Sequence, residues 1–585
     1  MFRLLRYMRK REWMFASGVL FFVVCSVFLT LKLPDYMTKV TRLVETGGAM
    51  NDILKAGAIM IACAIGDACC SIMVSFCASQ VSCRFSTRVR DAVYTKVVGF
   101  SMEEIGRFST ASLITRSTND ITQVVILISQ GMQAFLRAPI IAIWAFIKIL
   151  GKGWQWMIVV AIAVVIVAAT IGSNMILVIP KFRMIQKLTD NLNKVARELL
   201  SGIRVVRAYN AESYQENKYD TANVDLRDNH LYTGRIMAFM PPTINIVMSA
   251  TSLAIYWVGA HMIQGTPMAG RVDLFSQLVT FMAYAANIIM AFMMVSMIFI
   301  MLPRAMVAAG RLNEVLDTET KVVDGAGNDN PYKEGRVEFR NVSFQYPDAE
   351  EKVLENITFT AEPGETVAFI GSTGSGKSTL INLVPRFYDV TEGEVLVDGV
   401  NVKEYTQHQL HHRIGYIAQK AVLFKGTIKS NIEFGHDSEH EMTDEWVTRA
   451  LTIAQGKDIL DKEEKGLYTE VAQGGTNFSG GQKQRISIAR AIAKDPEIYI
   501  FDDSFSALDY KTDKTLRATL KKETQNATTL IVAQRIGTVR DADKIVVLDE
   551  GKAVGIGTHD ELMQSCDVYR EIAFSQLSEE ELANA

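Results

Sequence analysis

The feature that most constrains this chain is a set of long apolar runs in its first half. They cover residues of about 13–33, 53–79, 121–150, 154–180, 237–263 and 274–302. Each run is long enough to cross the ~30 Å hydrocarbon core of a bilayer as a helix. Helices and closed barrels satisfy the backbone in lipid, and the strict alternation of barrel strands is absent. The sequence therefore predicts a membrane α-helical bundle with six transmembrane helices.

The segments outside these runs indicate how the chain is oriented in the membrane. Five basic residues lie near the N-terminus, namely Arg3, Arg6, Arg9, Lys10 and Arg11. Lys and Arg favour the cytoplasmic side, and an even number of spans returns the chain to the side where it started. The links at about 80–120 and 181–236 are long and basic. We therefore expect a multi-pass protein of the cell membrane, with cytoplasmic termini and helices that extend into the cytoplasm.

The second half of the chain differs in charge and in pattern. Residues 1–316 carry 31 Lys and Arg against 18 Asp and Glu, whereas the remainder carries 30 against 46. From Arg336 onwards, short β-branched runs alternate with helical stretches, which is typical of an α/β domain with a largely parallel sheet. We therefore expect a transmembrane domain at 1–316, a polar, glycine-rich linker at 317–335, an α/β domain at 336–576 and an acidic tail at 577–585.

A glycine-rich loop follows the short apolar strand TVAFI and matches the P-loop pattern G-x-x-x-x-G-K-S. Its glycines permit a tight turn whose N–H groups surround phosphates, Lys377 supplies a charge to the β- and γ-phosphates, and the Ser378 hydroxyl binds Mg²⁺. ATP and Mg²⁺ are the predicted cofactors. The loop residues assigned to ATP are Gly371, Ser372, Thr373, Gly374, Ser375, Gly376, Lys377, Ser378 and Thr379.

A second apolar strand, EIYIFDD, ends in the two carboxylates Asp502 and Asp503. An acidic residue at this place in a P-loop protein holds Mg²⁺ through water, which is the role expected for Asp502. Paired acids at the end of a strand are also used as helix N-caps, and this remains the alternative interpretation.

The run Phe478, Ser479, Gly480, Gly481 and Gln482 resembles the signature motif of ATP-binding cassette (ABC) proteins. Six apolar helices followed by one such cassette are similar to the half-transporter layout of type IV ABC exporters, and the resemblance covers nearly the whole chain. It implies ATP-driven transport across a membrane. In this family each ATP lies between the P-loop of one cassette and the signature motif of the other.

Other segments resemble further motifs of that family. Tyr346 looks like the aromatic residue that stacks on adenine, and Gln419 looks like the Q-loop glutamine that senses Mg²⁺. The remaining resemblances are a D-loop at 506–509 that includes Asp509, an X-loop at 469–475, and two intracellular loops with coupling helices at 108–120 and 198–212.

Two positions depart from the family pattern, and both concern hydrolysis. Asp503 stands where the family has a general-base Glu, and Gln534 stands where it has a switch His. Asp is one methylene shorter, and a misplacement on the order of 1 Å can lower a rate ~10²-fold. A Gln amide also cannot carry the charge of an imidazolium. Together the departures resemble the degenerate site of heterodimeric ABC exporters, although Asp503 could still act as a slow base.

The resemblance therefore implies a partner that differs from this chain. A homodimer would hold two slow sites, whereas a second half-transporter with the catalytic Glu and the switch His would complete one fast site. The signature motif of this chain, 478–482, would then act on the ATP of the partner. Ser479 and the N–H groups of Gly480 and Gly481 would donate to its γ-phosphate.

Charged and flexible side chains within the spans mark a candidate transport path. Asp67 and Arg137 lie inside predicted spans, where charges are costly and often functional, although pairing or an interhelical hydrogen bond would also explain them. Lys148 lies nearer a helix end, where snorkelling to the interface is the ordinary interpretation. The last span carries methionines at steps of three or four residues, which suit either packing or a cavity for apolar cargo: Met290, Met294, Met297 and Met301.

The leading functional hypothesis is export of small hydrophobic or amphipathic compounds, such as drugs or lipids, by a membrane protein in contact with lipid. No nucleic-acid partner is expected. A second hypothesis keeps the fold and reverses the direction of transport, as in an importer of siderophores. A third belongs to another functional class, a nucleotide-regulated receptor or channel subunit. Transport into vesicles with ATP on one face distinguishes the first two, and cargo-independent ion conductance identifies the third.

Overall fold

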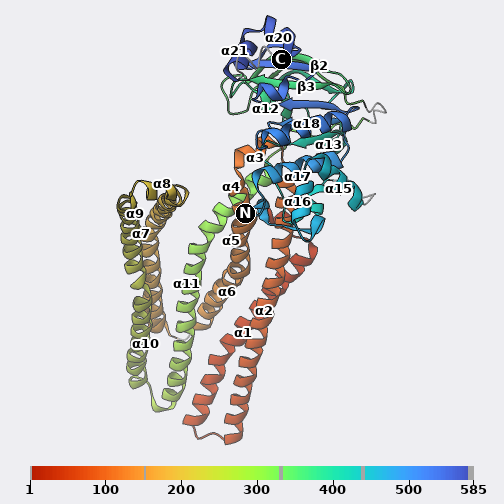
Figure 1. The fold of residues 1–585 in the computed structure, drawn as a ribbon. Coiled ribbons are helices and arrows are strands. Elements are labelled where there is room, and N and C mark those ends of the chain that lie inside the picture. The colour runs from red at the N-terminus through yellow and green to blue at the C-terminus, as the bar shows by residue number, and fades with distance from the viewer. Residues whose placement is uncertain (1–2, 151–152, 329–333, 436–441, 577–585) are drawn as a thin grey trace. The chain divides into compact units, whose positions relative to one another are not determined.

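The computed structural model describes residues 3–150, 153–328, 334–435 and 442–576 (Figure 1). The predicted acidic tail at 577–585 lies outside the described residues. The chain divides into two compact units: residues 1–98 with 111–318, and residues 99–110 with 319–585.

The first unit is helical. Six helical segments of its described residues are long and apolar enough to cross a membrane, which confirms the predicted number of spans. They are α1 (Lys10–Glu45), α2 (Met50–Val98), the run from α4 (Thr110–Thr115) to α6 (Met132–Ile149), α7 (Trp154–Ser201), α9 with α10 (Glu212–Ala238 and Met240–Gln264), and α11 (Met268–Asp317).

Several of these helices are much longer than a membrane is thick. α2 has 49 residues and α7 has 48, and at 1.5 Å per residue both exceed the ~30 Å hydrocarbon core more than twofold. Long extensions beyond the spans are therefore confirmed. The short helix α8 (Ile203–Ala208) joins α7 to α9 at the tip of one such extension (Figure 1).

The third span is irregular at two places. π-helical turns at Arg116–Asp120 and Leu127–Gly131 interrupt it on either side of α5 (Ile121–Ile126). Each π turn shifts the side chains that follow around the helix, and such turns are frequent at functional sites.

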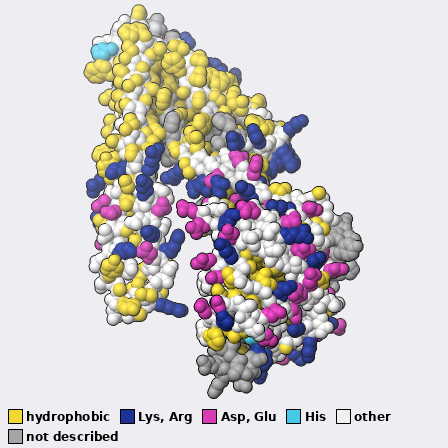
Figure 2. All heavy atoms as spheres, turned by 90° about the horizontal axis from the view of Figure 1, so that it is seen from above, with side chains coloured by type: hydrophobic (Ala, Val, Ile, Leu, Met, Phe, Trp, Pro, Cys, Tyr) yellow, Lys and Arg dark blue, Asp and Glu magenta, His cyan; other side chains and the backbone are white. Residues whose placement is uncertain are grey.

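The membrane unit has a narrow core and an apolar outside. Val19, Val23, Val27 and Leu31 recur every four residues along α1, so they lie on one helical face, and all four are buried. Large apolar side chains such as Phe21 remain exposed on the other faces, and Figure 2 shows hydrophobic side chains over much of the surface of these helices. A surface of this kind suits contact with lipid.

The second unit contains the predicted α/β domain. A six-stranded sheet has the order β12-β11-β3-β10-β9-β6, in which β12 alone is antiparallel to its neighbour. Its strands are β3 (Thr366–Gly371), β6 (Ile414–Ile417), β9 (Ile498–Asp502), β10 (Thr528–Val532), β11 (Lys544–Asp549) and β12 (Lys552–Gly557). The prediction of a largely parallel sheet is confirmed.

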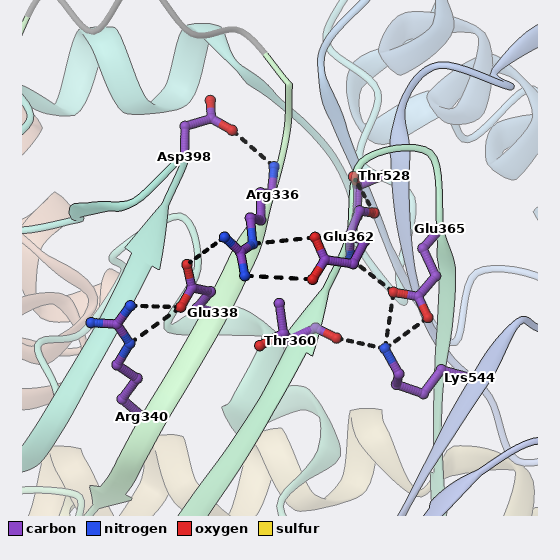
Figure 3. A network of polar contacts seen from close by, with 9 residues as sticks. All are labelled: Arg336, Glu338, Arg340, Thr360, Glu362, Glu365, Asp398, Thr528 and Lys544. Atoms are coloured by element: carbon purple, nitrogen blue, oxygen red, sulfur yellow. Dashed lines mark hydrogen bonds and ion pairs between the residues drawn. The ribbon is translucent and has the colours of Figure 1, made fainter.

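A second sheet is antiparallel and has the order β2-β1-β4-β5. Its strands are β1 (Val337–Phe344), β2 (Leu354–Ala361), β4 (Glu392–Val397) and β5 (Val400–Asn401). A polar network connects it to the six-stranded sheet (Figure 3). Lys544 Nζ donates to the carbonyl oxygen of Thr360 over 2.7 Å and pairs with Glu365, and Arg336 pairs with Glu362. These contacts fix how the edges of the two sheets meet.

The parallel strands bring the predicted motifs to one edge of the sheet. β10 lies between β3 and β9, and Val532 is in register with both Phe369 and Asp502. Because β3, β9 and β10 run in the same direction, the loops after their carboxyl ends meet. This edge is where open parallel sheets bind ligands.

Candidate functional site

The P-loop runs from the end of β3 to the start of α12 (Lys377–Asn382). Gly376 has a left-handed φ of 94°, and a Cβ there would lie 2.7 Å from Leu354 Cδ2. A residue with a side chain would be both strained and crowded at this position, so the loop requires glycine.

The ammonium group of Lys377 lies within the curve of this loop. Its Nζ donates to the carbonyl oxygens of Gly371 over 2.9 Å and of Ser372 over 2.6 Å. Burial lowers the pKa of Lys377, and the nearby carboxylates of Asp503 and Asp502 oppose that shift. A cation held beside the N-terminus of a helix forms a site for anionic phosphate.

Ser378 and Asp502 lie together beside the loop. Ser378 Oγ donates to Asp502 Oδ1 over 2.7 Å. Burial raises the pKa of Asp502, while the hydrogen bond from Ser378 lowers it. A hydroxyl and a carboxylate are the hard oxygen donors that Mg²⁺ prefers, so these residues fit a magnesium ion on a bound nucleotide. Bound there, Mg²⁺ would neutralise charge on the β- and γ-phosphate oxygens.

Asp503 follows directly and adopts a left-handed φ of 45°. Its N–H donates to the carbonyl oxygen of Val532 over 3.0 Å. Its Oδ2 accepts two amide hydrogen bonds, from Gln419 Nε2 over 3.1 Å and from Gln534 Nε2 over 3.0 Å. The predicted base position, switch position and Q-loop position are therefore in direct contact.

Tyr346 lies next to the P-loop helix. Its hydroxyl is 3.0 Å from Thr379 Oγ1, and its ring meets Phe344 and Tyr388 edge-on at centroid distances of 4.8 and 5.3 Å. The sequence analysis did not identify Tyr388 as part of this group. Tyr388 lies in a segment that matches no recognised motif, so the sequence did not indicate that it would contact Tyr346.

The signature motif forms the start of α17 (Gly480–Ala493). Ser479 Oγ accepts from the N–H of Gln482 over 3.3 Å, and Gln482 Oε1 accepts from the N–H of Ser479 over 2.8 Å. This reciprocal capping fixes the first turn of the helix. Ser479 and Gly480 are exposed, whereas Phe478 is buried in the core of the domain. The first turn therefore presents a hydroxyl and backbone N–H groups to the surface.

Two groups of predicted residues thus form separate sets of contacts in this chain. The P-loop, Asp502, Asp503, Gln419 and Gln534 converge at one edge of the sheet. No hydrogen bond joins 478–482 to 371–379 among the described residues. Asp509, the predicted D-loop residue, caps α18 (Tyr510–Glu523) by accepting from the N–H of Thr512 over 3.0 Å.

In the membrane unit, Asp67 forms an interhelical hydrogen bond. Its Oδ1 accepts from Ser26 Oγ over 2.5 Å. Within the described residues it forms no ion pair with Arg137, whose Nε is buried without a hydrogen-bond partner. Of the predicted methionine stripe, Met290 is exposed and Met294 packs against the core of the helices. Met301 is half-buried, and the side chain of Met297 lies outside the described residues.

Lys148, for which snorkelling to the interface was the ordinary interpretation, forms an ion pair between helices near the end of α6. Its Nζ pairs with Asp35 Oδ2 over 2.7 Å, and Tyr284 donates to Asp35 Oδ1 over 2.6 Å. This polar cluster joins α1, α6 and α11. Asp35 follows Pro34 and lies beyond the predicted apolar run at about 13–33, and α1 continues through this proline to Glu45.

Comparisons with known proteins agree with this architecture. Residues 16–292 match the ABC transporter transmembrane region, and residues 354–506 match the ABC transporter family. The chain is 39% identical over 563 residues to an uncharacterised ABC transporter ATP-binding protein of Mycobacterium tuberculosis, with 94% of each chain covered. It is 30% identical over 510 residues to an ATP-dependent lipid A-core flippase of Pseudomonas aeruginosa, covering 87% of this chain and 83% of that protein.

The fold also matches a solved structure. A bacterial Atm1-family ABC exporter with ATP bound superposes with a TM-score of 0.75 and 24% identity, over 98% of this chain and 99% of that one. At this level of identity the likeness shows the fold.

Proposed function

Because the chain belongs to the ABC transporter family as an exporter-type half-transporter, we propose that it is one subunit of a heterodimeric exporter and carries its slow ATP site. The observation that carries this proposal is the pair of amide hydrogen bonds to Asp503. The P-loop and Asp502 supply what MgATP binding needs, whereas the hydrolytic position is altered.

The contacts of Asp503 make it a poor base. Its Oδ2 already accepts hydrogen bonds from Gln419 and Gln534, so this oxygen has less capacity left to accept one from an attacking water. The amide of Gln534 occupies the place of a charged imidazole and cannot stabilise developing charge on the γ-phosphate in the same way. Both features support the interpretation that this site binds and retains ATP rather than hydrolysing it rapidly.

The signature motif has a different role in this proposal. Ser479 and Gly480 are exposed, and the capping of α17 holds their polar groups in place. They are available to the ATP on a second cassette. A partner with a catalytic Glu and a switch His would then hold the fast site, completed by the signature motif of this chain.

The proposed cargo is hydrophobic or amphipathic and moves outward. Support comes from relatives that are named lipid A-core flippases and from Met290 and Met294 on α11. The basic N-terminal cluster supports cytoplasmic termini. Outward transport then follows from the resemblance to exporters, with ATP bound on the cytoplasmic side.

The function is tested by finding which cassette turns ATP over. The full chain is co-purified with its partner half-transporter in lipid nanodiscs and trapped with vanadate and radiolabelled ATP. The nucleotide is then photo-crosslinked to the chain that holds it, and the two chains are separated. We expect ADP on the partner and intact ATP on this chain. Lys377→Ala serves as the control, because it should remove the label from this chain alone. ADP in equal amounts on both chains would contradict the proposal.

A further inference from the structure

A buried carboxylate lies in the short helix α3 (Met102–Phe108), between the second and third spans. Glu104 is 2% exposed. Its Oε2 accepts from the N–H and the hydroxyl of Ser101, over 2.7 and 2.6 Å. Its Oε1 accepts from the backbone N–H of Lys321, over 3.0 Å. Burial alone would raise the pKa of Glu104, but these hydrogen bonds hold it below the ordinary value.

Lys321 belongs to the segment that the composition predicts as a polar linker, yet the neighbouring residues are docked. Gly325 N–H donates to the carbonyl oxygen of Tyr405 over 3.0 Å, and Gly327 N–H donates to that of Glu404 over 3.1 Å. A Cβ on Gly325 would lie 2.4 Å from the carbonyl oxygen of Glu404. The close approach of the two backbones therefore requires glycine.

Side chains add further contacts along the same segment. Asp324 Oδ1 accepts from the N–H of Gln407 over 2.8 Å, and Gln407 Nε2 donates to the carbonyl oxygen of Val322 over 3.2 Å. Val322 is 4% exposed, whereas Val323 is 63% exposed. Residues 319–328, which we call the strap, are therefore attached to the cassette over most of their length.

The attachment point leads to the ATP site. Gln407 is the first residue of α13 (Gln407–His412), which is followed by β6. Arg413, between them, pairs with Asp398 over 2.7 Å and is buried. β6 ends two residues before Gln419, which donates to Asp503. The path from Glu104 to Gln419 thus consists of hydrogen-bonded backbone and regular secondary structure.

We propose that the strap holds α3 on the cassette of its own chain, and that Glu104 is the positioning residue through which α3 and the Gln419 region are coupled in cis. A docked strap cannot absorb a displacement of α3 as a flexible linker would, because its backbone donors would lose their partners. MgATP binding beside Gln419 therefore changes the conformation of α3 in the same chain. This coupling does not depend on how fast the site hydrolyses ATP.

The test follows amide hydrogen exchange in the full chain in nanodiscs, with and without MgATP. Two variants release the strap from opposite ends: Glu104→Ala at α3, and Gly325→Ala at the cassette. Gly106→Ala is the matched control on α3, because a Cβ there meets nothing within 4 Å. Val323→Ala is the matched control in the strap, because that side chain is exposed.

In the unsubstituted chain, MgATP should change the rate of amide hydrogen exchange at 99–108 at least about fivefold. Both strap variants should lose this change while binding MgATP within about twofold of the original affinity, and both controls should retain it. The double variant should lose no more of the MgATP-induced change in exchange than either single variant, since both substitutions break the same linkage. The proposal is overturned if MgATP leaves 99–108 unchanged in the original chain, or if α3 still responds in Gly325→Ala.

Discussion

Gln534 Nε2 donates to Asp503 Oδ2 over 3.0 Å, so the residues expected at the switch and base positions are hydrogen-bonded to each other. Gln419 donates to the same oxygen. The residues that we propose as the altered base and the altered switch residue are therefore parts of one polar cluster next to the P-loop. Substituting one of them leaves the others with unmatched hydrogen-bonding groups, which makes their effects interdependent.

The first prediction concerns the chain without a partner. Lys377, Ser378 and Asp502 are arranged for MgATP, whereas Asp503 is held by two amides. We expect the purified chain, alone or as a homodimer, to bind MgATP but to hydrolyse it at least about tenfold more slowly than the heterodimer. Equilibrium binding of a fluorescent ATP analogue and phosphate release measure the two properties. Rapid phosphate release from rigorously partner-free protein would contradict this expectation.

The second prediction concerns the signature motif. Gly480→Val should lower ATPase activity of the heterodimer at least about tenfold, because the side chain would occupy the space before the helix N-terminus where the partner's γ-phosphate is expected. A Cβ at Gly480 meets nothing within 4 Å, so the chain itself should fold normally. ATP binding to this chain's own P-loop should be unchanged, and Lys522→Ala is the control. Turnover within about twofold of the original would refute a composite site.

The third prediction concerns the cluster of Asp35, Lys148 and Tyr284, which joins three membrane helices. Each of Lys148→Met and Asp35→Asn should lower the midpoint of thermal unfolding in detergent. The loss of stability in the double variant should be smaller than the sum of the losses in the two single variants, because both substitutions break the same ion pair. The coupling corresponds to ~0.6–2 kcal/mol, the range found for polar contacts between membrane helices. Lys39→Met, at an exposed cation, is the control, and strictly additive losses would show that the pair contributes nothing.

The sequence predicted those features that depend on contiguous residues. The six spans follow from length and hydropathy alone, and the P-loop is a local pattern between a strand and a helix. The convergence of Gln419 and Gln534 on Asp503 could not be predicted, because it requires β6, β9 and β10 to be neighbours in the sheet. A sequence pattern identifies strands but does not give their order.

Other contacts were missed because they depend on packing over long separations. Asp35 and Lys148 meet only when α1 and α6 are rotated to face each other, and Asp35 lies beyond the apolar run from which the first span was predicted. The sequence analysis placed Gly325 in a polar, glycine-rich linker. Its real constraint is the backbone of Glu404, nearly eighty residues further along the chain, and no local signal reveals that.

The last prediction concerns restoration of the proposed slow site. Asp503→Glu would extend the carboxylate by one methylene, and Gln534→His would return an imidazole that can carry charge. Because both groups act on one water and one γ-phosphate, each change alone should raise turnover by less than about threefold, whereas together they should raise it by about 10²-fold. Phosphate release is measured in a heterodimer whose partner has its catalytic Glu replaced by Gln, so that only this site turns over. MgATP affinity should stay within about twofold, which separates a gain in chemistry from a gain in binding.

If the partner's signature motif is also altered, its repair in the same background is the necessary companion variant. A fully repaired site that remains as slow as the original would mean that Asp503 and Gln534 are not what limits hydrolysis there.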